Sequence, residues 1–370
     1  MAERSIIRAM EKVCNHGIDT GVFPGCSAAV SYKKGSSWKR CVYAAGKEGN
    51  VYGNSKVNEY TFFDLASLTK PLCTVLLLLH LIDEQAVCWD TPLGSIFPLK
   101  KECDKNQITL THLLSHSSGL PAYKPFFKQS PPVFDKNKKK FIFDSIINEH
   151  LLFQPGKNNC YSDLGFMLLG FAIEKISGRS LNEFYKEKIT VPLELENNLF
   201  FLPLDNNQHI EKEKKVAFTE FCSWRNKYIH KEVHDEHCWL MGGVSGHSGL
   251  FGDVNGVLFL CEYLFDIWQG ESNKIFLFEK ENVRKIFRKP GKNKTWYLGF
   301  DTPTKGKSSS GHYFTAKSAG HLGFTGTSFW MDPEKEVIVI LLTNRVHPSR
   351  ENTKIKQFRP YFHDQLMVLI

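Results

Sequence analysis

Strand-type segments lie near both ends of this chain, and helix-type segments fill the middle. Residues 26–32 and 38–44 are β-type runs joined by a loop rich in turn residues, so they predict an N-terminal hairpin. Strand signals return only near the end, over residues 297–300, 312–316, 327–331 and 337–342. From Lys70 to about Leu264 the apolar residues recur at helical spacing. This order predicts an α/β (α+β) fold: an antiparallel sheet completed by both termini and flanked by helices, with a mostly helical lobe inserted.

The 370 residues, of which 42% are hydrophobic, suffice for a large core. We therefore expect a single catalytic domain over residues 1–370. Its α/β lobe would comprise about 1–72 and 270–370, and its helical lobe about 73–269. Residues 354–370 are expected to form a terminal amphipathic helix.

Charge and cysteine usage argue against several functional classes. The net charge of +8 is mild for this length and its cations are scattered, which disfavours a nucleic-acid partner. The ten cysteines show no C-x-x-C pair and no metal-ligand spacing, so we expect no metal, no cofactor and no disulfide framework. The N-terminus lacks a signal-peptide pattern, and the apolar run Pro71–Ile82 is too short to cross a bilayer. A cytoplasmic location without a membrane partner is the expectation.

The segment Ser67-Leu-Thr-Lys70 stands directly before that apolar run. Residues three apart on a helix share a face, so Lys70 can reach the Ser67 hydroxyl, and burial would lower the lysine pKa toward that of a base. The same pattern occurs at Ser31 and Ser36, in and beside the hairpin loop, where lysine would be solvated. The alternative is that Ser67 and Thr69 are only polar residues of a helix N-terminus.

Two later segments add to this pattern. Tyr161-Ser-Asp163 begins another apolar helix, and a tyrosine near a catalytic lysine can act as base or acid, although it can also simply anchor a capped helix start. Further on, His321 and Gly323 lie at a strand edge. Backbone N–H groups there suit an acyl oxyanion and substrate main chain, and the glycine permits close approach.

In this order the three segments resemble the signatures of the serine β-lactamase and penicillin-binding protein superfamily. More narrowly, they are similar to the class C β-lactamase-like branch, in which esterases often carry His in place of the third-motif Lys. Five further stretches share this likeness: residues 64–70, 110–121, 233–236, 246–252 and 343–348.

The resemblance implies a role for each matching residue. Ser67 would be the acylated nucleophile, Lys70 its proton partner and Tyr161 the base or acid. His321 would correspond to the third-motif lysine, and the backbone N–H groups of Ser67 and Phe324 would form the oxyanion hole. The implied reaction is acyl transfer through an acyl-enzyme that water releases.

Two departures from the family pattern bear on the substrate. Asp163 stands where the family usually has Asn, so an amide that can donate a hydrogen bond is replaced by a carboxylate that only accepts. This carboxylate would keep the Lys70 ammonium charged and shift the role of general base toward Tyr161. Leu322 replaces the threonine of the third motif, and His321 is expected to be neutral near pH 7. Losing both contacts to a ligand carboxylate argues against efficient penicillin turnover and for an uncharged ester or amide.

We therefore expect a serine hydrolase, an esterase or a peptidase or amidase, acting on small ester or peptide-like substrates. The alternatives are a class C-type β-lactamase or D-Ala-D-Ala carboxypeptidase, and a non-catalytic binding or assembly module that retains the fold. His247-Ser248-Gly249 is a rival third motif, but a helical pattern follows it, so we assign it to a loop near the site. For His234 and Asp235, a structural role and a catalytic role stay equally open.

Overall fold

A five-stranded antiparallel sheet joins the two ends of the chain. The computed structural model describes residues 2–49, 55–135, 137–205, 214–271, 277–291 and 295–370. The strand order is β2-β1-β10-β9-β8, with bounds β1 (Gly25–Lys34), β2 (Ser37–Gly46), β8 (Ala319–Leu322), β9 (Ser328–Asp332) and β10 (Val337–Thr343). Cys26 of β1 lies opposite Thr343 of β10. The predicted sheet, built from both termini, is confirmed.

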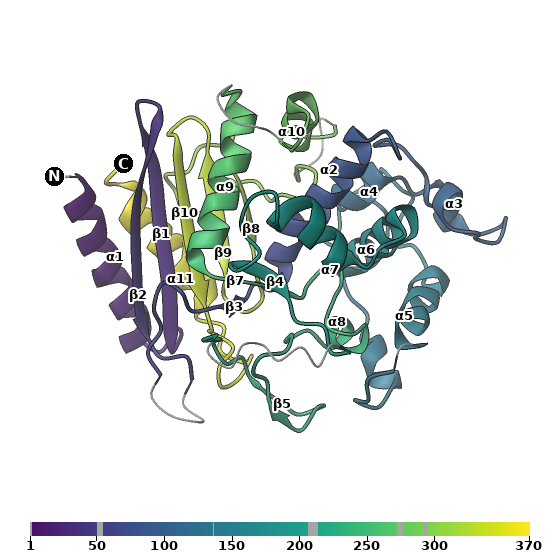
Figure 1. The fold of residues 1–370 in the computed structure, drawn as a ribbon, viewed down its shortest axis with the longest axis horizontal. Coiled ribbons are helices and arrows are strands. Elements are labelled where there is room, and N and C mark those ends of the chain that lie inside the picture. Colours follow the sequence, from purple (N-terminus) through teal and green to yellow (C-terminus); the bar gives the residue numbers. More distant parts are fainter. Residues whose placement is uncertain (1, 50–54, 136, 206–213, 272–276, 292–294) are drawn as a thin grey trace.

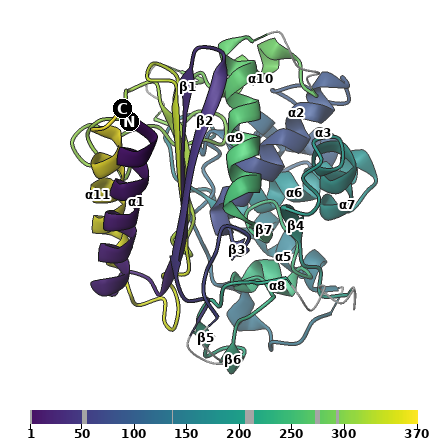
Figure 2. The same cartoon turned by 60° about the vertical axis from the view of Figure 1, so that its left-hand side comes forward.

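Helices cover both faces of this sheet. Figures 1 and 2 show α1 (Ala2–Asp19) and α11 (Ile355–Met367) side by side on one face, and α9 (Val254–Gln269) on the other. The strand β10 is buried along its whole length. Its side chains alternate between two hydrophobic clusters, because Val339 packs toward α1 and α11 while Ile340 packs toward α9. A strand covered on both faces reads as a continuous hydrophobic run, as residues 337–342 do.

The remaining elements build the helical lobe and its edges. The helices are α2 (Val75–Asp83), α3 (Leu93–Ile96), α4 (Leu110–Leu114), α5 (Asn137–Asn148), α6 (Asp163–Ser177), α7 (Leu181–Tyr185), α8 (Glu236–Leu240) and α10 (Lys280–Ile286). Short 3₁₀ or π turns are η1 (Ala66–Leu68), η2 (Lys70–Thr74), η3 (Asp104–Gln107), η4 (Phe126–Gln129) and η5 (Lys186–Thr190). Small sheets are formed by β3 (Phe63–Asp64), β7 (Leu250–Gly252) and β4 (Leu199–Phe201), and by β5 (Phe221–Cys222) and β6 (Lys227–Tyr228).

Two predicted strands were wrong. Residues 297–300 form a tight turn, in which the Tyr297 N–H donates to the Phe300 carbonyl at 3.0 Å and Gly299 adopts a φ of +83°. Residues 312–316 form bends, because the Thr315 backbone N–H and hydroxyl both donate to the Asp332 carboxylate rather than to a strand. The outer strand is β8 instead.

The helix α9 lies in the layer that covers the sheet, although its sequence position assigned it to the helical lobe. It contacts β1 and β10, and its Glu262 binds Arg40 of β2 with an Nε–Oε1 distance of 2.8 Å. The exact limits of the two lobes stay a prediction.

One helical stretch, Ala66–Asp83, is long and apolar enough to pass a membrane-span test by composition, and 83% of it is buried inside the fold. It runs through η1, η2 and α2 and is longer than the apolar run that the sequence indicated. Its leucines belong to the main hydrophobic core.

Candidate active site

A cavity of about 740 Å³ opens where the edge strand β8, the start of α11 and the helical lobe meet. Ser67 lines it from η1 and Tyr161 from the segment just before α6, while His321 and Phe324 line it from the sheet edge and Lys356 from α11. The cavity thus gathers all three sequence motifs at one place. Its volume falls in the range typical of small-molecule sites.

Ser67 is presented by a strained turn. The residue before it, Ala66, has a φ of +48°, which is uncommon for a residue with a Cβ. The buried carboxylate of Asp64 fixes this turn, because it accepts hydrogen bonds from the N–H groups of Ala66 at 2.8 Å and His234 at 2.7 Å. Strain of this kind persists only where the surroundings enforce it, and it is common at functional sites.

Lys70 is fully buried and has an acceptor for each of its three N–H bonds. Its Nζ lies 3.0 Å from Ser67 Oγ, 2.7 Å from Asp163 Oδ1 and 3.1 Å from the carbonyl oxygen of His247. Burial lowers the pKa of Lys70, but the charge of Asp163 and the hydrogen bonds of the lysine to Asp163 and Tyr161 outweigh it, so the net effect is a raised pKa. Lys70 therefore rests as an ammonium that donates to the serine, rather than as a free base.

Asp163 is available to Lys70 because its neighbour caps the helix. The Ser162 hydroxyl accepts from the Gly165 N–H at 3.2 Å and so forms the N-cap of α6. One of the two capping residues considered from the sequence, Ser162, has that role. The Asp163 carboxylate instead pairs with Lys70, as the sequence argument anticipated.

Tyr161 lies among aromatic rings beside the lysine. Its ring centroid is 5.1 Å from Lys70 Nζ, 4.5 Å from the ring of His116 and 5.4 Å from that of Trp296. Burial raises the pKa of Tyr161, and the Lys70 charge only partly opposes this. The phenol is consequently protonated near neutral pH.

His321 lies within β8 itself and is 1% exposed. Its Nδ1 is 2.9 Å from the Leu322 carbonyl oxygen, which can only accept, so Nδ1 carries the proton. Burial, with the Lys70 charge, lowers the pKa of His321 to about 3. The ring is neutral, and its Nε2 presents a lone pair with no partner among the described residues.

Gly323 and Phe324 form the turn that follows β8. The Phe324 carbonyl accepts from Arg345 Nε at 2.8 Å, which holds the turn, and the Phe324 side chain is 48% exposed. Both residues line the cavity together with Ser67. The oxyanion hole formed by the N–H groups of Ser67 and Phe324 stays a prediction.

Replacing Gly323 by alanine is expected to lower the free energy of unfolding by about 1–3 kcal/mol, because the added methyl group would overpack the pocket wall. A Cβ at this position would lie 1.9 Å from Thr327 Oγ1 and 2.7 Å from the Leu65 carbonyl oxygen. Thermal and urea unfolding would measure the change. Gly165→Ala is the matched control, since the nearest neighbour of its Cβ would be Leu113 Cδ2 at 3.5 Å, an ordinary contact. Equal losses in both variants would contradict the argument.

A hydrogen-bonded chain behind Lys70 was not assigned from the sequence. His247 Nε2 is 2.9 Å from Asp235 Oδ1, His247 Nδ1 is 2.8 Å from Ser245 Oγ, and the His247 carbonyl accepts from Lys70. Burial raises the pKa of Asp235, but His247 outweighs it and the net effect is a lowered pKa. The chain fixes the carbonyl that orients Lys70. The stretches 233–236 and 246–252 carried the signal, but their pairing did not follow from their spacing.

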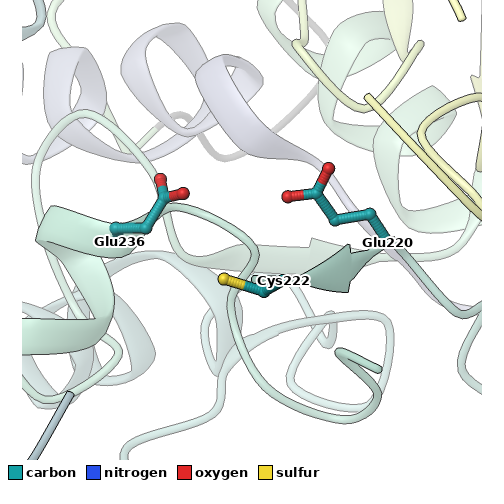
Figure 3. A group of neighbouring side chains, drawn as sticks. All are labelled: Glu220, Cys222 and Glu236. Carbon is teal, nitrogen blue, oxygen red and sulfur yellow. The ribbon is translucent and has the colours of Figure 1, made fainter. Parts of the chain in front are cut away.

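Figure 3 shows a second cluster, in which the side chains of Glu220, Cys222 and Glu236 point toward one another. The guanidinium of Arg350 already bridges its two carboxylates, with Nε 2.7 Å from Glu220 Oε1 and Nη2 2.6 Å from Glu236 Oε1. Burial opposes ionisation of Glu220, but His234 and Arg350 lower its pKa to about 2. An arginine therefore supplies the positive charge that this cluster needs.

Comparison with known proteins identifies the family. The family model described as Beta-lactamase matches residues 7–359. This chain belongs to the beta-lactamase family. The resemblance found in the sequence motifs is therefore confirmed, and the family covers both lobes.

Proteins similar to this beta-lactamase family member carry several names. A putative D-alanyl-D-alanine carboxypeptidase of Salmonella typhimurium is 29% identical over 318 residues, covering 80% of this chain and 72% of that protein. An N-acetylmuramyl-L-alanine amidase of Bacillus subtilis is 28% identical over 369 residues, covering 92% and 81%. The solved structure of EstCE1, described as a hydrolase with promiscuous acyltransferase activity, has a TM-score of 0.75 at 18% identity and covers 99% of both chains. This last likeness shows the fold.

Proposed function

We propose that the protein is a serine hydrolase that cleaves small ester or peptide-like substrates through an acyl-enzyme on Ser67. The observation that carries the proposal is the 3.0 Å contact between Lys70 Nζ and Ser67 Oγ within the 740 Å³ cavity. The names of the relatives, a carboxypeptidase and an amidase, support a peptide-like substrate. The neutral His321 and the apolar Leu322 disfavour a β-lactam carboxylate.

In the first step, Ser67 Oγ forms a bond to the substrate carbonyl carbon while its proton passes to the Tyr161 and Lys70 pair. The pair then returns that proton to the leaving group as the bond between the carbonyl carbon and the leaving group breaks. Water adds to the acyl-enzyme by the same path and frees Ser67. Because Lys70 and Tyr161 both rest protonated, one of them must first lose its proton, and activity is expected to rise with pH.

Ser67→Ala is expected to abolish covalent labelling by a fluorophosphonate probe, as measured by intact-mass spectrometry. The chain supplies a matched control in Ser36→Ala, which alters a second Ser-x-x-Lys match in the exposed hairpin turn and should label like the wild type. A wild-type protein that binds substrate analogues yet stays unlabelled would favour the non-catalytic alternative. Nitrocefin turnover as fast as that of p-nitrophenyl esters would favour the β-lactamase alternative.

A further inference from the structure

Four carboxylates line the cavity, and they differ in whether a positively charged or imidazole group lies beside them. Three of the four have a cationic or imidazole partner, namely Asp163 with Lys70, Asp235 with His247 and Glu236 with Arg350. The fourth, Asp301, has no such partner among the described residues, and its Oδ1 accepts only the N–H of Thr302 at 2.8 Å. A half-buried carboxylate without a counter-charge at a cavity wall is available to a cationic ligand.

Asp301 is held rigidly at the edge of the sheet. Its N–H donates to the Gly320 carbonyl at 2.7 Å, and its carbonyl accepts from the Gly320 N–H at 3.0 Å. The tight turn 297–300 precedes it and places Trp296, at its other end, on the wall of the same cavity. Hydrogen bonds therefore fix the backbone that carries the carboxylate, and the Trp296 ring packs against the rings of His116 and Tyr161.

The bridge to Asp301 also limits how far a substrate can extend along β8. Backbone groups of alternate residues point to the same side of a strand, so those of Leu322 point to the side on which Gly320 meets Asp301. Asp301 already pairs with Gly320 on that side of β8. A substrate backbone that pairs with Leu322 must therefore end at Asp301. The group at that end of the substrate is the one that Asp301 can contact.

One further feature favours a cation at this wall. Trp296 lines the cavity, and the face of an indole ring attracts cations. Burial raises the pKa of Asp301 to about 7, opposed only by the Thr302 N–H, and a bound cation would bring that pKa down again. Of the four cations in the lining, Arg345 and Arg359 donate to backbone carbonyls and Arg350 binds Glu236. The fourth, Lys356, is exposed at the start of α11.

We propose that the cavity selects substrates carrying a positively charged amine, held by the Asp301 carboxylate beside the Trp296 ring. This inference rests on the proposed hydrolase function and specifies its substrate class. Asp301 is then a specificity-determining residue and takes no part in bond breaking.

Two matched substrate pairs test the proposal. In the first pair, D-alanine 4-nitroanilide carries the charge on the acyl side, and propionyl 4-nitroanilide is its neutral counterpart. In the second pair, protonated 2-(dimethylamino)ethyl acetate carries the charge on the alcohol side, and 3-methylbutyl acetate is its neutral counterpart. In at least one pair the wild type is expected to prefer the cationic member. Asp301→Asn should lower kcat/KM for that member by about tenfold or more, mainly through KM, because a charge-assisted contact is lost. The neutral member should change by less than about twofold.

Asp301→Glu keeps the charge and should retain the preference, which separates recognition from folding. A wild type that labels with fluorophosphonate but treats both members of each pair alike would overturn the amine site and leave the hydrolase proposal standing. Equal losses for charged and neutral members in Asp301→Asn would also overturn it. A protein that does not label at Ser67 would overturn the hydrolase proposal and this inference with it.

Discussion

Lys70→Met is expected to lower the rate of Ser67 acylation by about a thousandfold or more, since proton transfer at the nucleophile depends on this side chain. Lys70 is the only described cation in contact with Ser67 Oγ, and it also pairs with Asp163. Methionine keeps most of the buried volume but supplies no N–H donor. The second-order rate of fluorophosphonate labelling would measure the loss.

The same change is expected to cost about 2–3 kcal/mol of unfolding free energy, because the Asp163 carboxylate, 23% exposed, loses its partner. A double variant, Lys70→Met with Asp163→Asn, removes the orphaned charge. It should regain part of the stability in urea unfolding and none of the labelling rate. If restoring stability also restored labelling, Lys70 would be a structural residue and its assigned role would be wrong.

Local sequence patterns were enough to locate the motifs of the candidate site. Ser67 and Lys70 are three residues apart, and the apolar run behind them predicted the burial that the structure shows. The sheet was predictable for a similar reason, since β1, β2, β9 and β10 carry clear strand patterns. The catalytic roles themselves remain proposals.

Long-range contacts decided what the sequence did not reveal. Burial alone predicts a lowered pKa for Lys70, and it is the substitution of Asp163 for the family's usual Asn that predicts a charged lysine. The structure shows that contact, between residues 93 apart in the chain, and a raised pKa of Lys70. The pairing of Asp235 with His247 depends on how α8 and the loop before β7 fold together. Asp301 gave no local signal at all, because its distinction is the lack of a counter-charge, which only the folded cavity defines.

Asp163→Asn is expected to shift the acid limb of the pH–rate profile for Ser67 labelling to lower pH by about one unit or more. The sign follows from the charges. Burial lowers the pKa of Lys70, and Asp163 and Tyr161 hold it above its usual value. Removing the Asp163 carboxylate weakens the effect that raises the lysine pKa. That pKa therefore falls, and more of the lysine is present as neutral amine at pH 7. Labelling near neutral pH should therefore become faster.

Asp144→Asn controls for the change in net charge, because Asp144 lies on the exposed face of α5 and pairs with Lys140. Its profile should match that of the wild type. An acid limb that stays in place or moves to higher pH in Asp163→Asn would mean that Lys70 does not supply the titrating group. Tyr161 would then be the base, and Tyr161→Phe would remove the acid limb together with most of the labelling rate, whereas with Lys70 as the base the limb would persist in Tyr161→Phe.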